Sequence, residues 1–357
     1  MRNISILCPP GMGSFDFETM NSKGLGGTET CILMMAHSLS LFGVKTNLYG
    51  PFTPDNRGDL RIRPYDAALV DDHDLLIYAR NLWWADELKI KYNDAMVWVH
   101  DTGFNVSNEF RESRINRVLA LSNWHKSRIL QEYPHIDPRI IILTQNGINS
   151  ERFKVSEHRN QANFIYSSGP DRGLEYLLDY WPDIKRNIPD AHLYVFSRID
   201  FWEKCVQGIA EKEVIVKKVK KSIQDLASQN VYHAGYIGQK ELAIHMSNAK
   251  LWLYPTDFTE TFCISAIEAQ MAGCSVVTSR LGALPETVKF GTLIEGTPKD
   301  EGYKYKFVEA VVREYESWSS KDVVNKFETI SNLYDWKVTA SQWKSDYLDQ
   351  QYLPFST

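Results

Sequence analysis

Two glutamates eight residues apart, Glu260 and Glu268, lie in a segment with a clear local pattern. Leu251 to Tyr254 is an apolar run that Pro255 ends, and apolar residues then recur at helical spacing until Gly273, a residue type that often follows a helix end. The pattern predicts a strand, a short loop and a helix, with Glu260 just before the helix. Glu268 falls within the apolar stripe of that helix, where a carboxylate is costly unless it has a specific partner.

This spacing suits one extended ligand. Eight residues of helix rise by about 12 Å, close to the separation between the sugar and the ribose of a nucleotide-sugar. Glu260 would hold sugar hydroxyls, the amides around residues 262–264 would receive the diphosphate at the positive helix end, and Glu268 would take both ribose hydroxyls. Two glutamates at this spacing also occur in ordinary helices, so the motif needs support from the rest of the chain.

Composition limits the class of protein. The chain has 357 residues, of which 43% are apolar and 12% aromatic, enough for two domains with substantial cores. A net charge of -5 argues against a protein whose main role is to bind bare nucleic acid. Five cysteines without a C-x-x-C pair suggest neither a disulfide framework nor a zinc site, which fits a reducing, cytoplasmic compartment. No apolar run suits a signal peptide or a membrane span, so we expect a soluble protein.

The first half begins with a glycine-rich loop. Ile4 to Leu7 is a predicted strand, and Gly26 and Gly27 precede a predicted helix, Thr28 to Phe42, with Thr28 as its N-cap. The order of strand, glycine loop and helix is typical of a phosphate-binding turn. It lacks the lysine of a P-loop and the full G-x-G-x-x-G spacing, so a simple tight turn is the alternative.

Alternating strands and helices follow in both halves. We predict strands at 44–49, 75–79, 96–100, 118–121 and 140–143, and again at 164–168, 191–197, 231–234 and 276–278, which is the pattern of parallel α/β sheets. Ligands meet such sheets at the carboxyl ends of strands, where His100 and Asp101 follow the most apolar strand. This placement favours a site over a structural histidine.

The Glu260-x7-Glu268 pair, with Thr261-Phe262 after the first glutamate, resembles the donor-site motif of the family-four glycosyltransferases (glycosyl transferases group 1), enzymes of the GT-B fold. Other segments resemble family motifs in the family's order. They are Gly26-Gly27, His100-Asp101, Asn146-Gly147, Arg172-Gly173 and residues 282–286.

The resemblance covers nearly all of the chain and implies an α/β GT-B fold with two Rossmann-like domains facing across a cleft. Residues 1–150 would form the acceptor-side domain, residues 151–333 the nucleotide-sugar-binding domain, and residues 334–357 a helix that crosses back to the first domain. It implies transfer of a sugar from a nucleoside-diphosphate sugar to an acceptor hydroxyl with retention, in glycan or glycoconjugate synthesis, with no further cofactor and no metal. We therefore reject Asp72-His73-Asp74, which has the form of a metal-binding D-x-D, because it precedes a strand in a fold that binds diphosphate without metal.

The resemblance also assigns the site. The catalytic group would be His100 and Glu260 on the donor sugar, Asp101 near the acceptor, and Arg172 opposite the leaving diphosphate. The implied donor-binding residues are Gly26, Gly27, Ser168, Arg172, Tyr236, Glu260, Thr261, Phe262, Cys263, Ile264 and Glu268. Three departures stand out: Arg172 occupies a position that is usually lysine, Ser167 and Ser168 stand near a usual arginine, and Cys263 replaces a usual glycine.

Two rival functions remain open. A non-catalytic nucleotide-sugar-binding protein of the same fold would lose the sugar-side residues, and His100 and Glu260 are both present. An epimerase-like enzyme would turn over the donor without an acceptor. The sequence is compatible with guanine, uridine or adenine donors. It is also compatible with glycan, lipid, protein or modified-nucleobase acceptors. The lysines at 217–221 allow a weak peripheral membrane contact, although a solvated helix face is favoured, and no stable nucleic-acid binding is expected.

Overall fold

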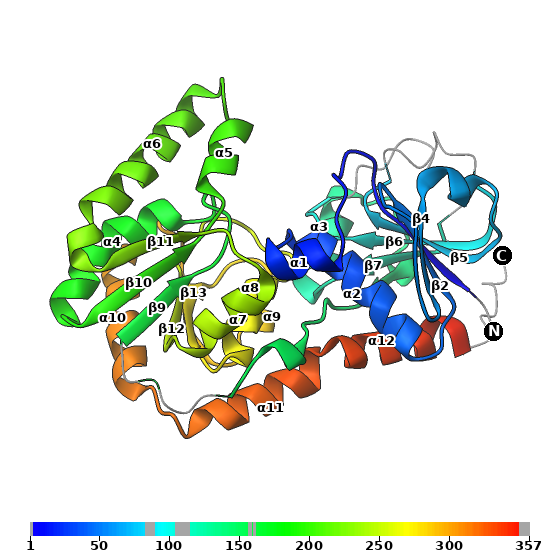
Figure 1. The fold of residues 1–357 in the computed structure, drawn as a ribbon. Coiled ribbons are helices and arrows are strands. Elements are labelled where there is room, and N and C mark those ends of the chain that lie inside the picture. The colour runs from blue at the N-terminus through cyan, green and yellow to red at the C-terminus, as the bar shows by residue number, and fades with distance from the viewer. Residues whose placement is uncertain (1–2, 83–89, 104–114, 156–158, 160–161, 350–357) are drawn as a thin grey trace. The chain divides into compact units, whose positions relative to one another are not determined.

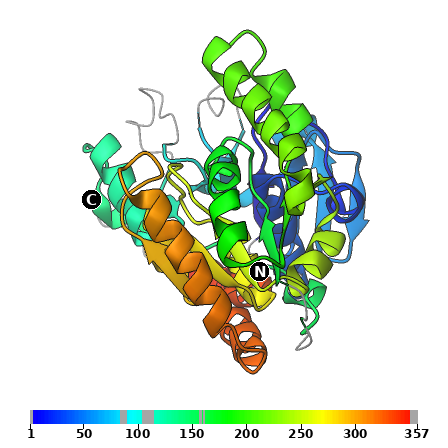
Figure 2. The same cartoon turned by 90° about the vertical axis from the view of Figure 1, so that its left-hand side faces the viewer.

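The structure, a computed structural model, describes residues 3–82, 90–103, 115–155, 159 and 162–349. Contacts divide the chain into two units. Residues 1–20, 25–149 and 333–357 form the first unit, and residues 21–24 and 150–332 form the second. Each unit is a parallel α/β layer structure with its helices packed on a central sheet (Figures 1 and 2).

The first unit contains an eight-stranded sheet in the order β3-β4-β2-β1-β5-β6-β7-β8. Its strands are β1 (Ile4–Leu7), β2 (Thr46–Gly50), β3 (Asp55–Arg57), β4 (Leu60–Pro64), β5 (His73–Arg80), β6 (Tyr92–Val99), β7 (Arg117–Ala120) and β8 (Ile141–Leu143). All neighbours pair in parallel except β3 and β4, an antiparallel pair at the edge. The predicted strands of this half are confirmed within a few residues, whereas β3 and β4 were not predicted.

Helices α1 (Phe17–Ser22), α2 (Gly27–Leu41), α3 (Asn123–Glu132) and α12 (Trp336–Lys344) accompany this part of the chain, with a short π-helix, η7 (Ser345–Asp349), after α12. The predicted N-cap Thr28 is wrong. Gly26 is the N-cap, with extended backbone (φ -63°, ψ 164°) and no side-chain cap bond, so α2 begins one residue earlier. Ser122 caps α3 and accepts a hydrogen bond from the His125 amide.

The C-terminal helix α12 packs against α2 within the first unit (Figure 1). Backbone hydrogen bonds join Ile148 to Tyr334 and Trp336, at 2.7 and 3.0 Å. Trp343 donates from Nε1 to Thr144 Oγ1 at 2.7 Å. Helix α12 and the residues just before it are therefore tied to the first unit by both backbone and side-chain bonds.

The second unit contains a six-stranded, all-parallel sheet in the order β11-β10-β9-β12-β13-β14. Its strands are β9 (Ala162–Tyr166), β10 (Ala191–Phe196), β11 (Val231–Gly235), β12 (Leu251–Tyr254), β13 (Ser275–Ser279) and β14 (Gly291–Ile294). Its helices are α4 (Leu174–Asn187), α5 (Ile199–Cys205), α6 (Ala210–Asp225), α7 (Gln239–Ser247), α8 (Ile264–Met271), α9 (Leu284–Thr287), α10 (Tyr303–Ser317) and α11 (Asp322–Tyr334). Because crossovers between parallel strands are right-handed, α4 and α6 cover one face and α7 and α8 the other.

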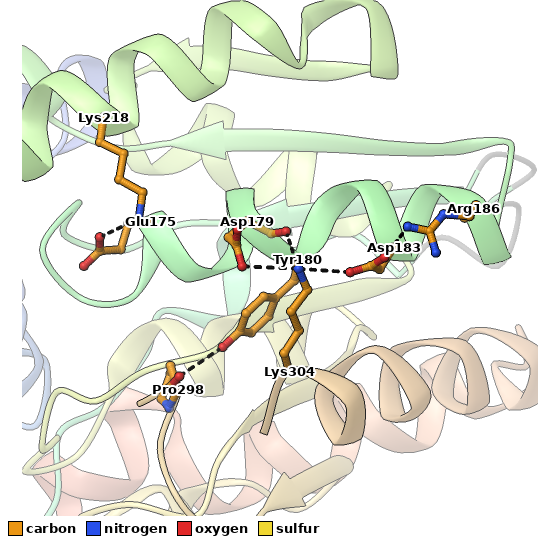
Figure 3. Close-up of polar contacts among 8 residues, drawn as sticks. All are labelled: Glu175, Asp179, Tyr180, Asp183, Arg186, Lys218, Pro298 and Lys304. Carbon is orange, nitrogen blue, oxygen red and sulfur yellow. Dashed lines mark hydrogen bonds and ion pairs between the residues drawn. The ribbon is translucent and has the colours of Figure 1, made fainter. Parts of the chain in front are cut away.

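The predicted lysine cluster lies on α6, and three of its lysines form ion pairs. Lys218 lies 3.4 Å from Glu175 on α4 (Figure 3), Lys220 bonds to Asp200 and Glu203, and Lys221 to Asp225. The same helix α4 receives Lys304, which bridges Asp179 and Asp183, while Tyr180 donates to the Pro298 carbonyl (Figure 3). Ion pairs of this kind are typical of a helix surface that faces water.

Among the described residues, no helix has both the length and the apolarity needed to cross a membrane.

Candidate active site

Glu260 lies in the loop between β12 and α8 and is buried, with 6% of its surface exposed. Its Oε1 accepts two hydrogen bonds, from the Tyr254 hydroxyl at 2.6 Å and from Arg172 Nη1 at 3.2 Å. Within the described ranges no bond reaches the second oxygen, Oε2. The described residues thus hold the carboxylate through one oxygen only.

Arg172 lies on the turn between β9 and α4. Its guanidinium carbon is 4.0 Å from the centroid of the Phe258 ring, and its side chain is 38% exposed. Burial alone would lower the pKa of Arg172, but nearby acidic groups, Glu260 first among them, outweigh it and raise the pKa above its ordinary value. The side chain therefore remains a fixed cation beside Glu260.

Gly173, the N-cap of α4, makes this pairing possible. Its backbone is left-handed (φ +105°), and a Cβ atom there would collide with the carbonyl oxygen of Pro255. Pro255 begins the loop that carries Glu260. A residue without a side chain is therefore required where the turn of Arg172 meets that loop.

Glu268 lies in the middle of α8 and is buried, as the apolar stripe predicted. Its partner is Arg152, whose Nη2 lies 2.9 Å from Oε1 and whose Nη1 donates to Gln239 Oε1. Burial raises the pKa of the Glu268 carboxyl, and Arg152 opposes part of that shift. As with Glu260, no bond from the described residues reaches Oε2.

The start of α8 has an unusual N-cap. Cys263 is buried and left-handed (φ +65°, ψ 73°), with no side-chain cap bond, and Ile264 begins the helix as its first residue. Thr261 and the buried Phe262 link it to Glu260. A glycine would adopt this backbone without strain, which gives a physical reason why the resemblance leads us to expect glycine at position 263. Burial raises the pKa of the Cys263 thiol well above its ordinary value, so the thiol is neutral.

The remaining predicted site residues of the second unit, Ser168 and Tyr236, also follow the carboxyl ends of strands in its sheet. The Ser168 carbonyl, just after β9, accepts a hydrogen bond from the Ser197 hydroxyl at 2.7 Å. Tyr236 follows β11, and its ring centroid lies 3.7 Å from the guanidinium carbon of Arg198, which follows β10. Arg198 was not predicted, although its place at a strand end was a usable signal.

His100 and Asp101 follow β6 in the first unit. His100 is buried and donates from Nδ1 to the Trp98 carbonyl at 3.1 Å. Burial, followed by the nearby His125, lowers the pKa of His100 to about 3, so its imidazole is neutral. Asp101 is exposed and accepts a 2.7 Å bond from Arg80 Nε, while its carbonyl accepts from His125 Nε2. Asp101 is therefore ion-paired, which the sequence did not show.

Gly26 and Gly27 lie at the start of α2, as N-cap and first residue. A Cβ atom on Gly26 would meet only the Glu29 carboxylate, the mobile end of a side chain, and the backbone of Gly26 is not left-handed, so this turn does not require glycine as Gly173 does. The rejected Asp72-His73-Asp74 segment has structural contacts: His73 bonds to Ser5 Oγ and to a backbone carbonyl, and Asp74 accepts from a backbone amide.

Residues 163–315 match the family model described as Glycosyl transferases group 1. The second unit is a group 1 glycosyl transferase domain. The chain is 25% identical over 226 residues to alpha-maltose-1-phosphate synthase of Mycobacterium tuberculosis, which covers 58% of this chain and 57% of the relative. It is 25% identical over 179 residues to an MMP alpha-(1->4)-mannosyltransferase of Mycolicibacterium hassiacum, covering 49% and 39%. The chain thus spans about half of the length of these curated relatives.

Solved structures match this chain over nearly its full length. Sucrose-phosphate synthase from Thermosynechococcus elongatus gives a TM-score of 0.72 at 17% identity, covering 98% of this chain and 99% of the other. Anabaena HepE, solved in complex with UDP and glucose, gives 0.68 at 16% identity, covering 98% and 100%. The fold is GT-B, as predicted.

Proposed function

We propose that the protein is a glycosyltransferase that moves a sugar from a nucleoside-diphosphate sugar to an acceptor hydroxyl with retention of configuration. One observation carries the proposal. Glu260 lies in the loop before α8 and Glu268 lies on that helix, each buried, each held through Oε1 by an arginine, and each without a bond from the described residues to Oε2. Only residues 264–268 of the stretch between them are helical and rise by about 6 Å, so the rise of about 12 Å expected for eight helical residues does not apply. In the proposal, the two carboxylates hold the sugar and the ribose of one ligand whose diphosphate lies at the start of α8.

The positive groups beside Glu260 and at the start of α8 fit the diphosphate. Arg172 supplies a fixed cation, and the first amides of α8 lie at the positive end of that helix. In the proposed reaction these groups stabilise the negative charge that grows on the departing diphosphate, so no metal and no resident cofactor are included. His100 and Asp101 of the first unit would act on the donor sugar and the acceptor.

The names of the relatives support the reaction class. The mannosyltransferase is a sugar-transferring protein by name, maltose-1-phosphate synthase is named for a sugar product, and HepE has also been solved with UDP-glucose. For this chain we propose a nucleotide-sugar donor and a glycan or glycoconjugate acceptor. The cytoplasmic location remains a prediction from cysteine content.

A donor screen tests this function. UDP-glucose, UDP-N-acetylglucosamine, GDP-mannose and ADP-glucose are added in separate thermal-shift assays, followed by assays for release of the nucleoside diphosphate. A donor present at about 100 times its dissociation constant stabilises the folded state by about 2.7 kcal/mol. We expect one donor to raise the melting temperature of the wild type more than that of Glu260→Gln.

Glu241→Gln serves as the matched control, because Glu241 is an exposed glutamate on α7 of the same unit. It should respond to the donor as the wild type does. A wild-type protein that none of the four donors stabilises, and that releases no diphosphate from any of them, contradicts the proposal.

A further inference from the structure

Two aromatic side chains contact the Glu260–Arg172 pair, one at each member. The Tyr254 hydroxyl bonds to Glu260, and the Phe258 ring lies against the guanidinium of Arg172. Both aromatic residues belong to β12 or to the loop after it, the segment that carries Glu260 itself. Neither was expected to be part of the site from the sequence.

Tyr254 is suited to fix the direction of Glu260. The residue is fully buried, and its ring packs 4.8 Å from Trp252 and 6.1 Å from Tyr166 between ring centroids. Burial, and then the charge of Glu260, raises the pKa of Tyr254 well above its ordinary value, so its hydroxyl keeps its proton and donates. A glutamate side chain has several rotatable bonds, and this donor restricts them before any ligand arrives.

Phe258 is suited to fix Arg172. Its backbone amide donates to Thr256 Oγ1 at 2.9 Å, and the Thr256 amide donates to Ser279 Oγ at 3.1 Å, so the loop beneath the ring is tied to β13. A guanidinium is planar and stacks on an aromatic face, whereas the ammonium of a lysine is a compact point charge. The ring therefore complements an arginine at the position where the resemblance leads one to expect lysine.

We propose that Tyr254 and Phe258 are positioning residues that preorganise the Glu260–Arg172 pair, Tyr254 for sugar recognition and Phe258 for stabilisation of the leaving diphosphate. The inference rests on the proposed function. It predicts that the two residues act on different steps: Tyr254 on the affinity for the sugar part of the donor, and Phe258 on turnover.

The first experiment removes only the hydroxyl, with Tyr254→Phe. Calorimetry compares the donor selected by the screen with its own free nucleoside diphosphate. We expect the dissociation constant of the donor to rise about ten-fold, as the loss of a hydrogen bond to a charged group implies, while that of the free diphosphate changes less than about two-fold. A general structural defect would weaken both ligands equally, and that result would overturn the role of Tyr254, as would unchanged donor affinity.

Tyr180→Phe is the matched control for this variant. Tyr180, on α4 of the same unit, also loses only a hydroxyl, which in this case donates to the Pro298 carbonyl (Figure 3). For Tyr180→Phe, the dissociation constants of the donor and of the free nucleoside diphosphate should both stay at the wild-type values. Thermal melts of all variants without ligand show whether each is folded.

The second experiment concerns Phe258 and measures hydrolysis of the same donor in the absence of an acceptor. Phe258→Leu is expected to lower kcat about five-fold with KM within about two-fold, and Phe258→Tyr, which keeps the ring, to restore kcat. In the Arg172→Ala background, Phe258→Leu should have no further effect, because its partner is gone. An equal loss in both backgrounds, or no loss in the wild-type background, overturns the role of Phe258.

The outcomes separate this inference from the proposed function. A wild-type protein that binds none of the four donors contradicts the proposed function, and the inference falls with it. A wild-type protein that binds and hydrolyses a donor, with variants that fail the tests above, leaves the function standing and overturns the inference alone.

Discussion

At the scale of single residues, the ion pair between Arg152 and Glu268 explains how α8 carries a buried carboxylate. Both side chains are almost fully buried, at 5% and 11% exposure. A buried ion pair gives little net stability, but loss of one partner leaves an uncompensated charge, so the pair is held for geometry as much as for energy. Arg152 holds Glu268 through Oε1, and no bond from the described residues reaches Oε2.

Glu268→Gln should therefore weaken the donor and the free nucleoside diphosphate alike. The neutral amide replaces a carboxylate that would accept hydrogen bonds from ribose hydroxyls, contacts worth about 1.5–3 kcal/mol, or roughly ten-fold or more in affinity. Calorimetry with both ligands measures the effect. Unchanged affinity in a folded variant would remove Glu268 from the site.

The sequence predicted that Glu268 needs a partner but could not name it. A charged residue within an apolar stripe is visible in one helix, whereas Arg152 lies 116 residues earlier, and no local pattern connects the two. The same limit applies to Tyr254, which reads only as a strand residue. Side chains that converge through tertiary folding leave no periodic signal.

At the scale of elements, two connections of the second unit depend on Gly173. The turn between β9 and α4 meets the loop after β12 so closely that a Cβ atom at Gly173 would collide with a backbone carbonyl. Backbone atoms cannot move aside as a flexible side chain does. The position of Arg172 relative to Glu260 thus depends on one missing side chain.

Gly173→Ala is expected to lower the free energy of unfolding by about 2–4 kcal/mol, the sum of a left-handed backbone penalty and overpacking. Gly302→Ala is the matched control: Gly302 is also a left-handed helix N-cap (φ +75°), but nothing lies within 4 Å of its Cβ position. It should lose only about 1–2 kcal/mol. Urea denaturation compares the two, and equal losses would show that the contact with Pro255 is not limiting.

Two buried histidines, His100 after β6 and His125 on α3, make the stability of the protein depend on pH. Burial lowers the pKa of His100 to about 3 and of His125 to about 4, and His125 accepts the Leu121 amide on one nitrogen and donates to the Asp101 carbonyl on the other. Both rings are neutral when folded, so the unfolded chain binds more protons once the pH falls below about 6.5.

The free energy of unfolding should therefore decrease as the pH falls from about 6.5 to 4, each histidine contributing up to about 1.4 kcal/mol per pH unit. His125→Gln should reduce this slope, measured by urea denaturation at several pH values. His135→Gln, at an exposed histidine of the same unit, should leave the slope unchanged. A wild-type slope in His125→Gln contradicts the account.

The elements that escaped sequence prediction share a physical reason. Strand β3 reads Asp-Asn-Arg and lies at the sheet edge, where no face needs to be apolar, and β14 is short and begins with a glycine. Central strands such as β1 and β12 are buried on both faces; β12 reads as a continuous apolar run, and β1 is apolar except for Ser5. Periodicity thus identifies the middle of each sheet better than its edges.

At the scale of the whole molecule, the order of weak motifs predicted the GT-B fold better than any single motif did. Each segment alone fits an ordinary turn or helix, but their order constrains two successive α/β units. The contacts within each unit are structural observations, whereas the reaction mechanism is a proposal that uses residues of both units.

We predict front-face retention of configuration. An inverting reaction needs a base within reach of the acceptor hydroxyl. Asp101, the only candidate from the sequence, is ion-paired with Arg80, and no second-face nucleophile is assigned among the described residues. The leaving phosphate oxygen would instead take the acceptor proton, so Asp101→Asn should impair acceptor use without abolishing donor hydrolysis. Proton NMR of the fresh product reads the anomeric coupling, and an inverted linkage would refute the mechanism.

The contact between Trp98 and Trp343 gives the molecule an optical property. Their ring centroids lie 4.9 Å apart, with 71° between the ring planes. We expect two indoles this close and this strongly inclined to couple their electronic transitions and to give a paired band of opposite signs in circular dichroism. Trp98 belongs to β6 and Trp343 to α12, so the expected band reports whether α12 is seated on the first sheet. The protein therefore carries its own spectroscopic marker of that docking, with no dye or label attached.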